Sequence, residues 1–393
     1  MVLGLVLPGS AVAFGPLASF GGLGGGPGQL SAPKQVAVDA DGNLYVADSG
    51  NDRISVFAGD GTFQRTFGEG QLSQPGDVAL GGGRAYVADS GDNRIAVFTA
   101  AGEFLFGFGG SELSEPAGVA VEGSTVYVAD RGNNRVLPFT LAGMSPTPGT
   151  AIGPIPSPRD VIVGRSGDLF VADFGEERID VYTPGGSLVR SFGESGAGAL
   201  SGPVALAPDG SGGIEVADQV AEQVERFSEE GGSLGGFPAE PDVAGVAAAC
   251  AGNVFAAMEG SARVVRFGEP GTPPPPCTEA TREEPIVAPV LKLPSNKFHF
   301  AGVRKNRSNG FAMLFVRVPG AGKLDLTGRG FRRLSRTARQ ATTVTIPVKP
   351  KVRLRHFLKR HGKGKIRVVV TFTPTGGIPR KLEKVIVLRR HRG

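Results

Sequence analysis

The stretch Tyr45-Val-Ala-Asp48-Ser-Gly-Asn-Asp-Arg53-Ile-Ser-Val-Phe57 decides the fold, because the chain repeats it. Six copies end at aromatic residues, which are Phe57, Phe98, Phe139, Tyr182, Phe227 and Phe267. Measured at the position of Asp48, successive copies lie 41, 41, 43, 45 and 40 residues apart. A steady period of about 40 residues indicates a repeat architecture in which each copy is one structural unit.

Each copy contains four short strand-like runs separated by turn residues. In the first copy these runs are Gln35–Asp39, Asn43–Asp48, Arg53–Ala58 and Phe63–Phe67. The connections Asp41-Gly42 and Asp60-Gly61 are typical of hairpin turns. Four strands in each repeat of about 40 residues predict the blades of a β-propeller.

The sixth copy supplies three runs instead of four, which raises the question of how the ring closes. Residues 15–22 (GPLASFGG) match the fourth-run segments Phe63–Gly68 and Phe104–Gly109 of the first two copies. We therefore expect Leu17–Phe20 to complete the last blade, so that no sheet edge stays open.

These residues resemble NHL repeats, through the pattern YVAD-x-G-N-x-R-I-x-V-F with a following F-G. The resemblance covers residues 14–268 and implies an all-β, six-bladed propeller. The fifth copy departs from it at Gln223, in the arginine position, and the sixth at Met258, in the aspartate position. The chain has no tryptophan, which excludes the WD40 type of blade.

Four copies pair an aspartate with an arginine five residues later. The pairs are Asp48 and Arg53, Asp89 and Arg94, Asp130 and Arg135, and Asp173 and Arg178. Across a tight turn, such side chains can bond to each other or to the loop backbone. A residue type repeated in several blades does not define one active site, so we interpret the pairs as structural clasps.

The sequence does not favour an enzyme. All four histidines (299, 356, 361 and 391) follow the propeller, whereas propeller lyases that resemble NHL proteins use propeller histidines. A calcium-dependent propeller hydrolase or lyase is the alternative, although no asymmetric acidic cluster for such an ion is evident. We predict no catalytic residue, no metal and no cofactor.

The charge is split between two parts of the chain. Residues 1–284 hold 15 Lys and Arg against 35 acids, a net charge of −20. Residues 285–393 hold 27 against two acids, Asp325 and Glu383, a net charge of +25. Residues 269–289 contain a Pro-rich run typical of a semi-rigid linker. The acidic balance disfavours RNA binding by the propeller.

Residues 290–393 contain about seven strand-like runs, a count typical of an immunoglobulin-like β-sandwich. The runs are Val290–Leu293, Lys297–Val303, Phe311–Val318, Gly322–Leu326, Thr342–Val348, Lys365–Thr373 and Lys381–Leu388. Val352–His361 is the one predicted helix. This part resembles the Lys/Arg-rich β-domains appended to secreted proteins of high-GC Gram-positive bacteria. The candidate contacts for a polyanion are Lys349, Lys351, Arg353, Arg355, Lys359, Arg360, Lys363 and Lys365, with Arg389, Arg390 and Arg392 at the end. The plain alternative is a solubilising charged surface.

Residues 1–13 (MVLGLVLPGSAVA) predict a signal peptide shortened at its start, with cleavage after Ala13, and the alternative is simply a hydrophobic N-terminus. In a secreted chain the two cysteines, Cys250 and Cys277, predict one disulfide. No run approaches the length of a membrane-spanning helix.

We therefore expect a non-catalytic, secreted or envelope-associated scaffold whose propeller binds a protein, peptide or glycan. Its basic domain would hold anionic envelope polymers. A second alternative is nucleic-acid binding through that domain in a cytosolic protein with free thiols.

Overall fold

The computed structural model describes residues 14–141, 143, 146–249, 252–273, 297–305, 311–328, 331–374 and 380–389. The predicted signal peptide, Cys250, Cys277, residues 274–289 of the predicted linker, Arg390 and Arg392 lie outside these ranges. The chain divides into two compact units, and each is described by itself. The first takes residues 1–141 and 146–290, and the second takes residues 142–145 and 291–393.

The first unit contains six four-stranded antiparallel sheets, numbered 1 to 6 along the chain. Sheets 1 to 3 are built from β2 (Pro33–Val38), β3 (Leu44–Asp48), β4 (Arg53–Phe57) and β5 (Phe63–Phe67); β6 (Pro75–Gly81), β7 (Arg84–Asp89), β8 (Arg94–Thr99) and β9 (Phe104–Phe108); and β10 (Pro116–Glu122), β11 (Thr125–Asp130), β12 (Arg135–Thr140) and β13 (Thr147–Pro148).

Sheets 4 to 6 repeat the same order of strands. They are built from β14 (Pro158–Val163), β15 (Leu169–Asp173), β16 (Arg178–Tyr182) and β17 (Leu188–Phe192); β18 (Pro203–Pro208), β19 (Gly213–Asp218), β20 (Gln223–Ser228) and β21 (Phe237–Pro238); and β22 (Val243–Ala248), β23 (Val254–Met258), β24 (Arg263–Gly268) and β1 (Gly15–Gly21).

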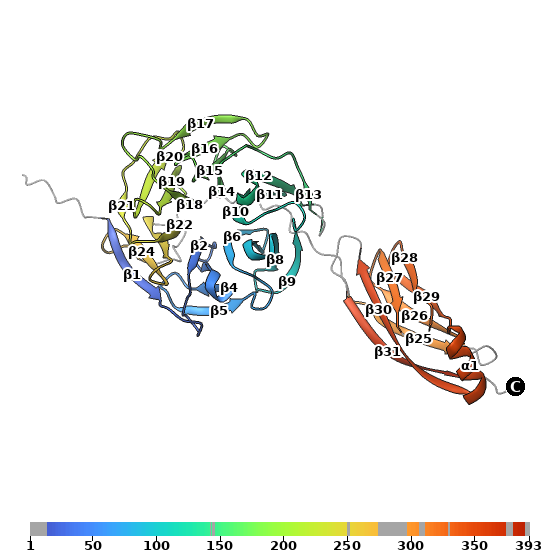
Figure 1. Ribbon diagram of the computed structural model, residues 1–393. Helices are drawn as coiled ribbons and strands as arrows, with labels where there is room; N and C mark the ends of the chain where they lie inside the picture. Colours follow the sequence, from blue (N-terminus) through green and yellow to red (C-terminus); the bar gives the residue numbers. More distant parts are fainter. Residues whose placement is uncertain are drawn as a thin grey trace, which may run out of the picture. The chain divides into compact units, whose positions relative to one another are not determined.

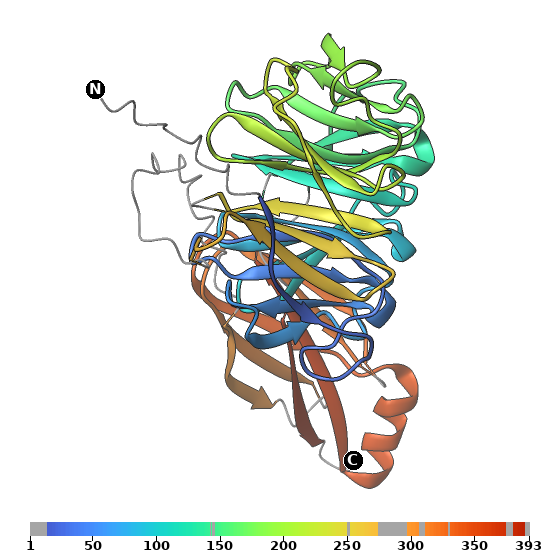
Figure 2. The same ribbon diagram turned by 90° about the vertical axis from the view of Figure 1, so that its left-hand side faces the viewer.

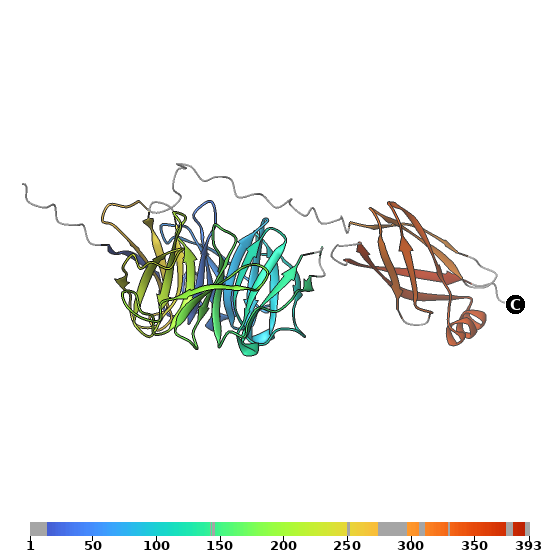
Figure 3. The same cartoon turned by 90° about the horizontal axis from the view of Figure 1, so that it is seen from above.

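The sheets stand around a common axis, as in a β-propeller (Figure 1). The first strand of each sheet lies nearest the axis, and the fourth strand lies at the rim (Figure 1). Seen edge-on, neighbouring sheets stand face to face (Figures 2 and 3). The second strands are the most buried, because every residue of β3, β15 and β23 is buried.

The N-terminal strand β1 occupies the position predicted for it, as the fourth strand of sheet 6. It pairs antiparallel with β24, with Ser19 opposite Val265 and Phe20 opposite Val264. The ring is therefore joined by the two ends of the first unit, and β24 is covered along its length.

Aromatic contacts join the neighbouring sheets. At five of the six junctions, a ring from the fourth strand of one sheet packs against the phenylalanine at or next to the end of the third strand of the next. These pairs are Phe20 and Phe57, Phe67 and Phe98, Phe108 and Phe139, Phe192 and Phe227, and Phe237 and Phe267, with ring centroids 4.9–5.1 Å apart. Phe20 of β1 thus makes the same contact as its counterparts in the other sheets.

The second unit consists of two sheets and one described helix. The sheets are β25-β26-β29 and β28-β27-β30-β31, built from β25 (His299–Lys305), β26 (Ala312–Val318), β27 (Gly322–Thr327), β28 (Leu334–Ala338), β29 (Thr342–Val348), β30 (Lys363–Pro374) and β31 (Arg380–Arg389). One hydrophobic cluster draws residues from both sheets, such as Leu314 and Val368. The immunoglobulin-like assignment stays a prediction.

The helix α1 (Val352–His361) has the predicted bounds, and Leu358 anchors it in the core of the second unit. Within the described residues, no helix has the length and apolar character needed to cross a membrane. The sequence analysis missed β28, and the expected strand at Val290–Leu293 lies outside the described residues.

The closing role of β1 predicts that Phe20→Ala destabilises the propeller. Phe20 is half-buried against Phe57, so we expect a loss of about 2 kcal/mol in the free energy of unfolding, below the 3–5 kcal/mol typical of a fully buried phenylalanine. All four tyrosines lie in the first unit and the chain has no tryptophan, so tyrosine fluorescence in urea follows the propeller alone. Leu23→Ala, at a side chain 77% exposed, is the control. Equal effects of the two variants would contradict the closing role.

Candidate functional site

The structure brings together three of the four predicted Asp–Arg pairs. The Nε atoms of Arg53, Arg94 and Arg135 lie 2.8, 2.7 and 2.8 Å from Oδ2 of Asp48, Asp89 and Asp130. Each aspartate also accepts a backbone N–H from a serine that precedes the first strand of its sheet. For Asp48 this donor is Ser31, at 2.7 Å. The pairs therefore tie the turn after the second strand to the entry loop of the same sheet.

The fourth predicted pair does not form. Arg178 donates instead to Asp180 and Glu194, with both distances 2.8 Å. The position of Asp180 is filled by Ser55, Ala96 and Leu137 in the first three copies. A carboxylate that competes for the arginine is therefore present in the fourth copy and not in those three. Asp173 keeps a buried Oδ2 atom without a partner among the described residues, and burial raises its pKa to about 6.

A cavity of about 220 Å³ opens where the first strands of all six sheets converge. We call it the axial cavity. Each first strand contributes the residue that follows its opening position, and these residues are Lys34, Gly76, Ala117, Arg159, Val204 and Ala244. The turns after the second strands add Ser49, Ser90, Arg131 and Gln219. The lining therefore differs from sheet to sheet although the backbone repeats.

A β-bulge shapes the lining at the start of every first strand. The register with the second strand shifts between Pro75 and Asp77, for example, and between Pro158 and Asp160. The same shift occurs in the other four sheets. A bulge re-aims the side chain of the inserted residue. Here it directs one residue of each repeat toward the axis.

Three polar residues at the next position, Gln35, Asp77 and Asp160, form an axial polar cluster below this ring. Each accepts a backbone N–H from a neighbouring sheet, and the donors are Val246, Val119 and Leu206, at 2.8, 2.7 and 2.8 Å. Gln35 Nε2 also donates to Asp160 Oδ2 at 2.7 Å, which links sheets 1 and 4. The cluster therefore joins sheets in pairs and then across the axis.

The other three sheets carry small residues at this position, which are Gly118, Ala205 and Gly245. A Cβ atom on Gly118 would lie 2.6 Å from Asp160 Cα, and one on Gly245 would lie 2.2 Å from the Lys34 carbonyl oxygen. Large polar and small residues are thus matched across the sheet junctions.

Burial raises the pKa values of both carboxyl groups in the axial polar cluster. The pKa of Asp77 rises to about 7, against two backbone N–H donors that lower it. The pKa of Asp160 rises well above its ordinary value, first through burial and then through the charge of Asp77.

The three cations of the axial cavity differ in their partners. Lys34 pairs with Glu259 at 2.6 Å, and Arg131 pairs with Glu115 at 2.8 Å. Arg159 has no hydrogen-bond or ion-pair partner among the described residues. Its guanidinium lies over the ring of Phe174, 4.4 Å from the centroid.

The sequence analysis missed the axial cavity, including the asymmetric placement of Gln35, Asp77 and Asp160. The available signal was the variation of the two residues after the opening position of each repeat. Among the described residues, no group of three or more His, Cys, Asp or Glu side chains is placed to hold a metal ion.

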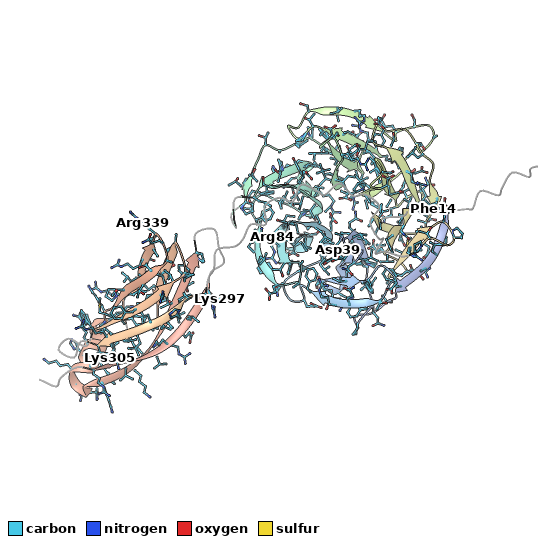
Figure 4. The ribbon with its side chains drawn as sticks, turned by 180° about the vertical axis from the view of Figure 1, so that it is seen from behind. Phe14, Asp39, Arg84, Lys297, Lys305 and Arg339 are labelled. Carbon is cyan, nitrogen blue, oxygen red and sulfur yellow. The ribbon has the colours of Figure 1, made fainter. Side chains whose placement is uncertain are left out.

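The candidate polyanion contacts lie on α1, on its approach and at the start of β30. Lys349, Lys351, Arg355, Lys359, Arg360, Lys363 and Lys365 are exposed, and the side chain of Arg353 is outside the described set. Other exposed cations, such as Lys305 and Arg339, lie elsewhere on this unit (Figure 4). The two acids of this part, Asp325 and Glu383, lie 3.6 and 3.5 Å from Lys323 and Arg367.

The family model described as NHL repeat matches residues 30–57 and 72–98. The streptogramin B lyase structure is 14% identical and covers 64% of this chain and 97% of that chain, with a TM-score of 0.50. A structural genomics protein of unknown function from Bacteroides thetaiotaomicron is also 14% identical, covers 66% and 72%, and has a TM-score of 0.50. The nidogen/laminin complex is 19% identical, covers 52% and 80%, and has a TM-score of 0.45. The chain thus contains NHL repeats in a β-propeller fold.

The raised pKa of Asp77 predicts that the propeller loses stability as the pH rises. The native state holds a proton on Asp77 that the unfolded chain releases above pH 3.8, so this stabilisation is complete below that value and lost through about pH 7. At about 1.4 kcal/mol per pKa unit, the loss is at most on the order of 4 kcal/mol.

Urea titrations between pH 4 and pH 8, followed by tyrosine fluorescence, measure this slope. Asp77→Asn should flatten it, whatever its effect on absolute stability. Asp173 and Glu215, with pKa values raised to about 6 and about 7, contribute equally in both proteins, and Asp160 keeps the rise in pKa that comes from burial but loses the smaller one that comes from the charge of Asp77. Identical slopes in the two proteins would show that Asp77 is ionised throughout.

Proposed function

We propose that this NHL-repeat propeller is a non-catalytic binding scaffold whose axial cavity receives part of a protein, peptide or glycan. In this proposal the six sheets are the blades of one ring, closed by β1. The second unit, taken as an immunoglobulin-like sandwich, holds the protein to anionic envelope polymers outside the cytoplasm.

The observation that carries the proposal is the lining of the axial cavity. A repeated backbone presents a different residue from every sheet, including cations, amides and small apolar side chains. A site that combines such groups can distinguish ligands, whereas the Asp–Arg pairs are alike in three sheets and support the fold. The cavity is smaller than the ~300–1,000 Å³ typical of drug-sized ligands. We therefore expect it to receive a side chain, a chain end or one sugar.

Filling the axial cavity should abolish binding. Ala117 lines the cavity, and Ala117→Phe would occupy much of its volume. Ala101→Phe places the same side chain on an exposed turn between β8 and β9 and is the control. Peptide and glycan arrays probed with the full chain should give signals that Ala117→Phe lowers at least tenfold. Signals that survive in Ala117→Phe would place binding elsewhere.

For the second unit we propose electrostatic capture of a polyanion. The exposed cations of α1 and β30 form the densest basic cluster in the described part of this unit. Each phosphate that such a cluster neutralises releases a condensed counterion, so affinity should fall steeply with salt. Ionic strength should then matter more than the identity of the polymer.

A charge-neutralised variant tests this. The triple change Arg355→Gln, Lys359→Gln and Arg360→Gln is compared with a control that removes equal charge, Arg304→Gln, Arg317→Gln and Arg336→Gln. Retention of the full chain on isolated Gram-positive cell walls and on duplex DNA is measured at several salt concentrations. If all three helix cations contact the polymer, the plot of log affinity against log salt becomes shallower in the first variant, and the magnitude of its slope decreases by about 3. Equal slopes in the two variants would indicate a diffuse surface charge.

A hydrolase or lyase is the second candidate, and one observation favours it. Asp77 and Asp160 line the axial cavity with raised pKa values, and a carboxyl group that titrates near neutral pH can act as a general acid. Against this, every oxygen of both carboxyl groups accepts a backbone N–H. Stoichiometric calcium in the purified full chain, with a lower melting temperature after chelation, would favour the calcium-dependent enzyme.

The extracytoplasmic location and the disulfide between Cys250 and Cys277 form one further part of the proposal. Cell fractionation with N-terminal sequencing tests the location and the cleavage after Ala13. Non-reducing peptide mapping tests the disulfide. A cytosolic chain with two alkylatable thiols that binds DNA but not cell walls would support the nucleic-acid alternative.

A further inference from the structure

The side chain of Arg159 is the one basic group of the axial cavity without a partner among the described residues. Its Nε atom is buried and makes no hydrogen bond, whereas the residue as a whole is half-buried and lines the axial cavity. The cation–π contact with Phe174, with Cζ 4.4 Å from the ring centroid, holds the guanidinium over that ring. A stacked guanidinium leaves its edge free, and that edge carries the paired N–H donors that fit a carboxylate.

The charges around Arg159 favour one negative charge. Burial and then the charge of Arg131 lower the pKa of its guanidinium, whereas the charges of Glu115 and Glu259 raise it, and the group stays cationic in a protein. Lys34 and Arg131 are already balanced by Glu259 and Glu115. One positive charge is therefore unmatched. The two glutamates would repel a dianion such as a phosphate monoester more strongly than a carboxylate.

The cavity volume indicates what carries this carboxylate. About 220 Å³ admits a chain end more readily than a whole drug-sized ligand. Serine and glutamine side chains that also line the axial cavity offer donors and acceptors for the peptide groups that precede the carboxylate, and these residues are Ser49, Ser90, Gln74 and Gln219. Recognition of a C-terminal carboxylate by N–H donors is an established mode of peptide binding.

We propose that the axial cavity captures the C-terminal carboxylate of a peptide chain, with Arg159 as the bidentate donor held in place by Phe174. This inference deepens the proposed function and rests on it. It also accounts for the residue types of sheet 4, where an arginine and a phenylalanine occupy two positions that no other repeat fills in this way.

The test uses the full chain and two peptide libraries of the same composition. One consists of N-acetylated tetrapeptides with a free C-terminal carboxylate, and the other carries a C-terminal amide. Mass spectrometry of the peptides retained after equilibrium dialysis gives their enrichment. We expect the wild type to enrich the free acids at least tenfold over the amides, and Arg159→Gln to remove this preference.

Two variants separate the loss of a ligand contact from a loss of structure. Arg190→Gln is the control, because Arg190 also lies over a phenylalanine, Phe170, and has a buried, unbonded Nε atom, but it donates through Nη2 to the Glu229 carbonyl and does not line the axial cavity. Arg159→Lys keeps the charge but removes the paired N–H donors, so it should show little of the wild-type preference for free acids over amides. Tyrosine fluorescence should show an unfolding midpoint for Arg159→Gln close to that of Arg190→Gln, because the Arg159 side chain makes no hydrogen bond or ion pair with a described group and each variant loses a contact with a phenylalanine ring.

The outcomes distinguish this inference from the proposed function. Equal enrichment of acids and amides that Ala117→Phe abolishes would overturn the carboxylate inference and leave the binding scaffold standing. A preference for free acids that Arg159→Gln leaves intact would overturn the role of Arg159. No enrichment of either library, with none on glycan arrays, would overturn the proposed function and this inference together.

Discussion

Each sheet of the propeller has two apolar faces, and only the neighbouring sheets can bury them. This constraint makes the ring depend on closure, because one missing strand leaves an edge and one missing sheet leaves two faces. The phenylalanine contacts show how neighbouring sheets bury each other's faces. The fourth strand of one sheet packs against the third strand of the next at five junctions. The pairing of β1 with β24 completes the same series across the ends of the unit.

At the axis the constraint is a different one. Backbone polar groups of six strands converge there, and they need hydrogen-bond partners. Gln35, Asp77 and Asp160 satisfy N–H groups of adjacent sheets, and the small residues opposite make room for them. Burying two carboxyl groups together is costly unless their oxygens are bonded, and here all four are. The axial polar cluster thus stabilises the first strands, which line the axial cavity.

Much of the fold could be predicted because its signals are local and repeated. The period set by Asp48, the fourth-strand pattern at Phe20 and the bounds of α1 all follow from short-range residue patterns. β28 was missed because Leu334 and Ala338 are its only apolar residues. Spacing alone predicts the pair Asp173 and Arg178, but the carboxylate of Asp180, two residues from Arg178, is the acceptor that the arginine bonds. Arg159 lies on β14 and Phe174 follows the end of β15, so their contact depends on how these two segments are placed in sheet 4.

The pairing of β1 with β24 has a consequence for how the protein is made. Strand β1 has its partner about 250 residues later in the chain, so it must wait until nearly the whole unit has been synthesised. Until then the nascent chain keeps an unpaired strand, which chaperones can hold. A product that terminates early can never complete the ring, and its open edge marks it for proteolysis. The order of the strands along the gene thus acts as a check that the propeller is complete.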